Sequence, residues 1–385
     1  MPNNYKDIRI DFNRPYIAHN QYAYIRQSIE SGHISGDGPF SKKCHAFFEQ
    51  TMGVKKALLT TNCTHALDMT ALLLNLKEGD EVIAPSFTFV STVNAFVLRG
   101  ARPIFADLRE DTLNIDERAI EGLITEKTRA IYIVHYAGVA CDMDGIMRIA
   151  EKYHLPVVED NAHGLFGKYK GQFLGTFAPL ACQSFHETKN ISCGEGGALF
   201  INDEALIERA EIIREKGTDR SRFFRGQVDK YSWVDIGSSY LPSEILAAVL
   251  YAQLEESQVI QSKRKAIWDF YFQSLSDWSQ KNNVRLPIVP DECEQSYHMF
   301  YLLLPSLDER QRFIHFLMEN GIYSVFHYVS LHTSAMGRKF GYMPGDLPLT
   351  ESISDRLVRL PFYFDLTEEE QASVISTVMK FQTVC

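Results

Sequence analysis

Short, continuously apolar runs alternate with stretches of helical spacing through the first half of the chain. An apolar run bounded by polar turn residues is typical of a strand that is buried on both faces. Seven such runs predict strands at 57–60, 81–86, 103–106, 130–134, 156–158, 180–184 and 198–201. Helices are predicted between and after them at 42–51, from 65 onward, at 116–123, 143–153, 204–216 and 243–256.

Strands that alternate with helices predict an α/β domain built on a mostly parallel, seven-stranded sheet. The length of 385 residues predicts a second, smaller domain as well. We expect an N-terminal arm over 1–24, a large ligand-binding domain over 25–253 and a small α/β domain over 254–385. In the small domain, strands are predicted at 298–304 and 323–328, and helices at 308–320 and 368–381.

Composition narrows the class of protein. The net charge of −10 argues against nucleic acid or an anionic membrane as the main partner. The seven cysteines are odd in number and form no Cys-x-x-Cys pair, which favours reduced thiols in a cytoplasmic protein over disulfides or a metal site. No apolar run is long enough to span a bilayer.

One stretch near the middle of the chain carries the strongest candidate for chemistry. Lys189 follows the predicted strand 180–184 and precedes a turn with three glycines at 194–197. A lysine at the mouth of a buried strand is poorly solvated, so its pKa falls and its free amine becomes a nucleophile or base. An ordinary surface-loop lysine is the alternative, and this stretch alone does not exclude it.

Other polar or aromatic residues stand where further strands end, which is where ligands bind in such sheets. They are the Cys63–Thr64 turn at a helix start, Phe89, Asp160, His163 and Ser184. A helix start favours an anion, although this turn could be a simple cap, and Phe89 could belong to the core. Together with Lys189, these groups are the ones that pyridoxal phosphate needs for its aldehyde, ring nitrogen and phosphate.

Several long runs resemble the DegT/StrS-type sugar aminotransferases, which have the aspartate-aminotransferase-like fold (fold type I). The resemblance extends from Ser-Gly-Asp-Gly-Pro at 35–39 to Leu-Thr-Glu-Glu-Glu-Gln at 366–371, and its most specific runs are 184–190, 211–217, 224–230 and 235–240. It implies that Lys189 forms the Schiff base with the cofactor and that Asp160 pairs with the pyridine nitrogen. It also implies that Ser184 and the Cys63–Thr64 turn contact the phosphate and that Phe89 stacks on the ring.

Two positions depart from the pattern of many relatives. His163 replaces a glutamine, so the protonation state of a histidine beside the cofactor becomes a new variable. Ser239 replaces an asparagine that reaches the phosphate in the partner subunit of a homodimer, which puts that contact in doubt. Candidates for substrate binding are Gly36, Asp37, Arg220, Arg225 and His327.

The resemblance implies transfer of an amino group from L-glutamate, by way of pyridoxamine phosphate, to C4 of dTDP-4-dehydro-6-deoxy-D-glucose. The product would be dTDP-4-amino-4,6-dideoxy-D-galactose, a precursor of enterobacterial common antigen. The 4-amino glucose epimer and amination at C3 remain open, and so does a non-catalytic, cofactor-binding regulator. A related sugar 3-dehydratase is disfavoured because the resemblance implies a histidine in place of Lys189 there. A nicotinamide dehydrogenase is disfavoured because no Gly-x-Gly-x-x-Gly follows an early strand.

Overall fold

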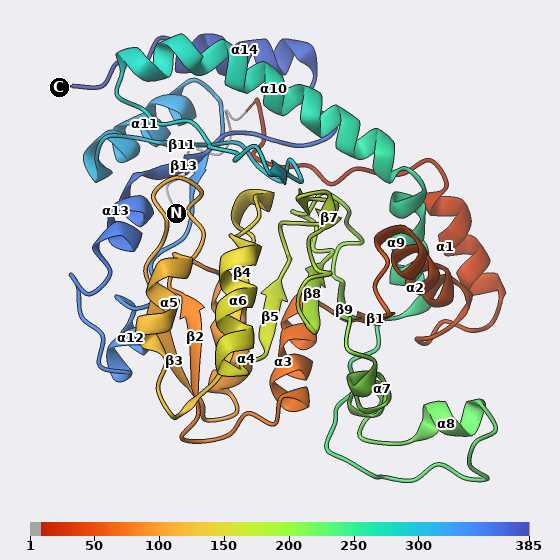
Figure 1. The fold of residues 1–385 in the computed structure, drawn as a ribbon. Coiled ribbons are helices and arrows are strands. Elements are labelled where there is room, and N and C mark those ends of the chain that lie inside the picture. The colour runs from red at the N-terminus through yellow and green to blue at the C-terminus, as the bar shows by residue number, and fades with distance from the viewer. Residues whose placement is uncertain (1–8, 385) are drawn as a thin grey trace.

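The computed structural model describes residues 9–384 and is organised around a seven-stranded sheet in the order β1-β9-β8-β5-β4-β2-β3 (Figure 1). Only β9 runs antiparallel to its neighbours. The prediction of a mostly parallel, seven-stranded sheet is therefore confirmed, and every strand overlaps a predicted run. The strands are β1 Lys56–Thr60, β2 Glu81–Pro85, β3 Arg102–Ala106, β4 Thr128–Val134, β5 Val157–Asp160, β8 Leu180–Ser184 and β9 Gly197–Ile201.

Helices cover both faces of this sheet because neighbouring strand residues point to opposite sides. On one face, Leu58 and Tyr132 pack beneath α3 (Cys63–Leu73), α4 (Val90–Val97) and α7 (Ile207–Arg214). On the other face, Leu59 packs against α2 (Pro39–Met52) and α9 (Glu244–Glu255), and Ile131 packs against α5 (Glu117–Leu123) and α6 (Met143–Tyr153). Each large side chain buried in this way contributes about 1.5–3 kcal/mol.

A small antiparallel sheet in the order β11-β13-β12 forms the centre of the C-terminal part. Its strands are β11 Tyr301–Leu303, β12 Val325–Phe326 and β13 Leu357–Arg359. Apolar side chains join this sheet to α10 (Ser257–Lys281), α11 (Leu307–Glu319) and α14 (Glu368–Val378), which lie at the top of Figure 1. The central strand, β13, was not predicted from the sequence, and neither were α12 (Ala335–Lys339) and α13 (Pro348–Arg356).

Several other segments differ from the sequence-based prediction. Helix α1 (Gln21–Glu30) begins inside the predicted arm and packs against α9, while residues 1–8 of that arm lie outside the described residues. The predicted helix 204–216 begins as a 3-10 turn, η3 (Glu204–Leu206), before α7. A second 3-10 turn, η2 (Tyr136–Gly138), follows β4.

After α7, the chain forms a long loop with the short helix α8 (Arg220–Phe224), which projects away from the sheet in Figure 1. A minor sheet consists of β6 (Lys168–Tyr169), β7 (Gln172–Phe173) and β10 (Cys293–Glu294). Within residues 9–384, no helix combines the length and the apolar character needed to cross a membrane.

Candidate active site

The carboxyl ends of β5 and β8 bring several of the predicted site residues together. Asp160 ends β5 and Ser184 ends β8, and β1 leads into the turn before α3. A small cavity beside these ends is lined in part by His163, Ser184 and Lys189 from the large sheet domain, and by His298 from the approach to β11. The site thus lies where the C-terminal part meets the edge of the main sheet.

Asp160 is buried, and its carboxylate has hydrogen-bond donors but no cationic partner among residues 9–384. Thr92 Oγ1 donates to Oδ2 at 2.7 Å and the amide of Ala162 donates to Oδ1 at 3.1 Å. Burial raises the pKa of Asp160, and these two bonds and the charge of Lys189 oppose that rise. Since a buried carboxylate is stabilised by a cation, the carboxylate is suited to a positively charged ligand atom.

Glu159 points to the opposite side of β5, as strand alternation predicts. It accepts hydrogen bonds from the amides of Gly175, Phe177 and Ala178 at 2.6, 2.9 and 2.7 Å, and it contacts His135 Nε2 at 2.9 Å. Its role is therefore to hold the chain after β7 against the sheet, whereas Asp160 points to the other side of β5.

Lys189 lies in a loop whose two ends are joined by backbone hydrogen bonds. Phe185 N donates to Gly196 O at 2.8 Å, and Cys193 N donates to Phe185 O at 2.9 Å. Burial lowers the pKa of Lys189 to about 8, with Cys63 and Asp160 acting in the opposite direction. About a tenth of the Lys189 amine is therefore uncharged at pH 7, far more than for an ordinary lysine, and the uncharged amine is the form that a nucleophile or base requires.

The turn between β1 and α3 presents free amide groups. Asn62 caps the helix by accepting from His65 N at 2.8 Å, and the amides of Cys63 and Thr64 have no partner among the described residues. Gly197 allows this close approach, because a Cβ there would lie 2.5 Å from Cys63 N. Unpaired amides at the start of α3 are a favourable site for a phosphate group.

Three histidine rings lie side by side next to the cavity. His163 stacks on His298 with ring centroids 4.3 Å apart, and the ring of His327 is 5.9 Å from that of His163. Burial lowers the pKa of all three rings well below the usual value, so they are neutral at pH 7. The Nδ1 atom of His163 has no partner among the described residues, whereas Tyr136 OH lies 3.0 Å from His327 Nδ1.

These features fit pyridoxal phosphate. The buried carboxylate of Asp160 lacks a cation, which a protonated ring nitrogen supplies, and the free amides at the start of α3 suit the phosphate. The unpartnered Nδ1 of His163 is a polar group beside the same space. Lys189 is the amine available to the aldehyde.

The other predicted site residues have partners that differ from those of this group, or are exposed. Phe89 is 56% exposed, and its ring centroid is 6.3 Å from that of Tyr328. Asp37 forms an ion pair with Arg214, and Gly36 packs against Leu241 and Pro242. On the projecting loop, Arg220 pairs with Glu215 at 2.9 Å, Arg225 pairs with Glu211 at 2.7 Å, and Ser239 is exposed.

Sequence reasoning missed several polar residues of the site. Thr92 and Ser91 lie on the first turn of α4, where Ser91 Oγ is 2.7 Å from Thr64 Oγ1. Both hydroxyl residues follow soon after the end of β2, and this position in the sequence could have predicted them as site residues. His298, Tyr328 and Arg359 come from the C-terminal part and gave no local signal.

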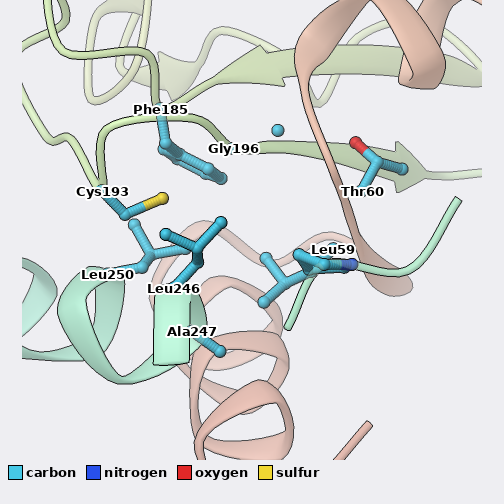
Figure 2. Close-up of a pocket in the computed structure, with 10 residues that line it drawn as sticks. Leu59, Thr60, Phe185, Cys193, Gly196, Leu246, Ala247 and Leu250 are labelled. Atoms are coloured by element: carbon cyan, nitrogen blue, oxygen red, sulfur yellow. The ribbon is translucent and has the colours of Figure 1, made fainter. Parts of the chain in front are cut away.

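The cysteines near Lys189 are packing residues. Cys193 and Phe185 line a small apolar cavity beneath the lysine loop, together with Leu246 and Leu250 of α9 (Figure 2). Burial raises the pKa of Cys193 to about 12, so its thiol is not a nucleophile at neutral pH. Cys44, Cys63, Cys141, Cys182, Cys193 and Cys293 are all free thiols.

Comparison with known proteins agrees with this geometry. Residues 15–379 match the profile of the DegT/DnrJ/EryC1/StrS aminotransferase family. An uncharacterised protein of Methanocaldococcus jannaschii is 33% identical over 375 residues, which cover 95% of this chain and 96% of that protein.

Two solved structures illustrate the likeness. The pyridoxal-phosphate form of a putative sugar aminotransferase from Streptococcus pneumoniae is 26% identical, with a TM-score of 0.89 over 96% of this chain and 98% of that one. Helicobacter pylori PseC, an aminotransferase of pseudoaminic acid biosynthesis, is 26% identical, with a TM-score of 0.87 over 96% and 98% of the two chains.

The fold and the family match define a fold-type I aminotransferase that uses pyridoxal phosphate. The chain belongs to the DegT/DnrJ/EryC1/StrS aminotransferase family, whose sugar aminotransferases transfer an amino group to keto sugars.

Proposed function

We propose that the protein transfers the amino group of L-glutamate to C4 of dTDP-4-dehydro-6-deoxy-D-glucose and releases dTDP-4-amino-4,6-dideoxy-D-galactose. This is the reaction of a dTDP-4-amino-4,6-dideoxygalactose transaminase, in the cytoplasmic synthesis of enterobacterial common antigen. The observation that carries the proposal is a lysine of lowered pKa beside a buried, unpaired aspartate in a chain of this family. The choice of sugar rests on the resemblance of the runs 184–190 and 224–230.

In this proposal Lys189 moves the proton. Its amine takes the proton from the donor carbon and later delivers one, a general acid–base role worth on the order of 10²–10⁴-fold in rate. Pyridoxal phosphate supplies an electron sink when it is bound. Asp160 would keep the ring nitrogen of the cofactor protonated, and the buried, neutral imidazole of His163 would contact the cofactor without adding charge.

In the same proposal, the amides of Cys63 and Thr64 and the hydroxyl of Ser184 would hold the phosphate. A homodimer would complete the site through Ser239 of the second subunit. The support for a dimer is the exposed apolar surface of the projecting loop, where Phe224 is 71% and Trp233 is 80% exposed. Exposed aromatic groups of this size are typical of interfaces.

The residues predicted to bind the substrate differ in their distance from the cavity. His327 lies beside His163 and is the one that we propose to face the sugar. Gly36, Asp37, Arg220 and Arg225 would reach a substrate only if the second subunit or a change of partners brought them there.

The test is the product formed from a panel of nucleotide keto sugars with glutamate as donor. Nuclear magnetic resonance of the product distinguishes the galactose epimer from the glucose epimer and from amination at C3. Formation of the galactose-configured 4-amino sugar supports the proposal, and either other product would correct it. Cofactor binding without any turnover would favour the regulator.

A further inference from the structure

The main chain at His298 is fixed by donors from two directions. Arg264 on α10 donates from Nε to Tyr297 O at 2.9 Å and from Nη2 to His298 O at 2.6 Å. Just before them, Ser296 N donates to Gly138 O at 3.0 Å. Arg264 is buried and has no ion pair among residues 9–384, so its guanidinium is used to hold this short segment. The ring of His298 therefore starts from a fixed backbone.

The side chain of Asn190, the residue after Lys189, sets which ring nitrogen of His298 carries the proton. Asn190 Nδ2 donates to Ser296 O at 2.6 Å, and since a carbonyl oxygen can only accept, this end of the amide is its NH₂ group. The other end, Oδ1, lies 2.9 Å from His298 Nδ1 and can only accept, so Nδ1 carries the proton. Burial lowers the pKa of His298 well below the usual value, so the ring is neutral and Nε2 keeps a free lone pair.

His298 Nε2 and Lys189 Nζ both lack a hydrogen-bond partner among residues 9–384. The two residues line the same small cavity, together with His163, whose ring stacks on that of His298 with centroids 4.3 Å apart. The charge of Lys189 contributes to the lowered pKa of His298, so the two groups are close enough to interact. The Nδ1 of His163 is also open, but no described neighbour fixes whether it donates or accepts. A set acceptor and an open donor thus share one cavity.

We propose that His298 positions the free amine of Lys189 by accepting a hydrogen bond from Nζ at Nε2. This inference rests on the proposed function and adds the residue that directs its proton carrier. When the amine takes the proton from the donor carbon, it becomes an ammonium group with three N–H donors. One donor directed to Nε2 leaves the others free to face the reacting atoms. The ring does not take the proton away, because the pKa of His298 lies well below that of Lys189.

Two substitutions separate the two nitrogens of the ring. His298→Asn keeps a donor at the place of Nδ1 and has no acceptor at the place of Nε2, whereas His298→Gln keeps an acceptor near Nε2. The control is His154→Asn, at the exposed end of α6, where the backbone is in a left-handed conformation that asparagine tolerates. Thermal melting and uptake of pyridoxal phosphate establish that each variant is folded.

The first readout is the pKa of Lys189 in the apoprotein, obtained from the pH dependence of its reaction rate with pyridoxal phosphate. An acceptor at Nε2 stabilises the ammonium form and raises the pKa of Lys189, so removal of the acceptor should lower it. A charge-assisted hydrogen bond changes an equilibrium about 10- to 100-fold, which equals about one to two pH units. We expect the rate to level off about one to two pH units lower in His298→Asn, with His298→Gln and His154→Asn close to the wild type.

The second readout is the loss of cofactor absorbance after the loaded enzyme is mixed with L-glutamate. In His298→Asn the rate at saturating glutamate should fall on the order of 10- to 100-fold, because the lysine is no longer directed at the donor carbon. The half-saturating glutamate concentration should stay within about threefold of the wild type, because the donor is still bound. Deuterium on the α-carbon of glutamate should slow this variant more than the wild type. His298→Gln should recover most of the rate.

An unchanged pKa of Lys189 in His298→Asn, with an unchanged rate, would overturn the inference. So would equal losses in His298→Asn and His298→Gln, because the ring would then serve only to pack against His163. A raised half-saturating concentration of keto sugar, with the glutamate reaction intact, would also overturn it, since Nε2 would then bind the sugar.

The first readout uses neither glutamate nor sugar. If the wild type did not react with glutamate at all, the proposed function would fail by itself, and the pKa of Lys189 would still decide whether Nε2 binds the lysine. If neither variant folded, nitrogen-15 spectra of the histidines in the wild-type apoprotein would decide instead. The inference requires an unprotonated ring nitrogen whose signal shifts as Lys189 titrates near pH 8, and it fails if no such signal moves.

Discussion

Thr92 is the residue whose replacement most sharply tests the role of Asp160. Its hydroxyl donates to Asp160 Oδ2 at 2.7 Å and lies 2.8 Å from Thr88 Oγ1, and all three residues are buried. Thr92→Val keeps the branched shape but removes the donor. The carboxylate then retains only the amide of Ala162, so the pKa of Asp160 should rise further.

The magnitude follows from the charge on the acceptor. A hydrogen bond to a charged group contributes about 1.5–3 kcal/mol, which corresponds to an affinity change of about 10- to 100-fold. We therefore expect spectrophotometric titration of the apoprotein to show weaker binding of pyridoxal phosphate by that factor. Because the proposed pairing with the ring nitrogen requires an ionised Asp160, the loss of binding on acidification should begin at higher pH in Thr92→Val.

A matched control is Thr70→Val in α3. The Thr70 hydroxyl is also buried and donates to Leu67 O at 2.7 Å, with Tyr132 OH 2.8 Å away, but it bonds to none of the predicted site residues. If both variants bound pyridoxal phosphate equally well, and lost it at the same pH on acidification, the assignment of Asp160 to the ring nitrogen would be refuted.

Three other predictions follow from the structure. The pKa of Lys189 is lowered to about 8, so the rate at which the apoprotein reacts with pyridoxal phosphate should rise about tenfold per pH unit up to about pH 8 and then level off. A rate that does not change between about pH 6 and pH 9 would contradict this. Glu159→Gln should lower the free energy of unfolding in denaturant by about 3–5 kcal/mol, whereas exposed Glu294→Gln should change it by less than about 1 kcal/mol; equal effects would speak against the role given to Glu159. Trp233→Asp should shift sedimentation from dimer to monomer, and Val259→Asp on α10 should not; a dimeric Trp233→Asp protein would exclude this loop as the interface.

The main sheet could be predicted from the sequence because its strands are continuous apolar runs. In contrast, β13 has only three residues, follows Arg356 and ends at Arg359, so it lacks a periodic apolar signal. Helix α1 is largely polar and is stabilised by packing on α9, so the local sequence pattern did not predict it. Short elements held by tertiary contacts are the ones that were missed.

The residues of the candidate site also fall into two groups, those that the sequence predicts and those whose position depends on tertiary packing. Asp160, Ser184 and Lys189 follow strand ends, and the topology of a parallel sheet brings such positions to one edge. His298 and Arg359 come from the C-terminal part, and their place depends on how that part packs on the sheet. Asp37 could not be placed from its loop, because its partner Arg214 lies far away in the sequence.

In the proposed function, Lys189 links the cofactor to the protein and moves the proton. The most direct measurement is the absorbance of the purified protein with pyridoxal phosphate, before and after L-glutamate, in the wild type and in Lys189→Ala. We expect a yellow wild type that glutamate bleaches, and a variant that neither forms the lysine-linked chromophore nor turns over. A Lys189→Ala protein with full aminotransferase activity would contradict it.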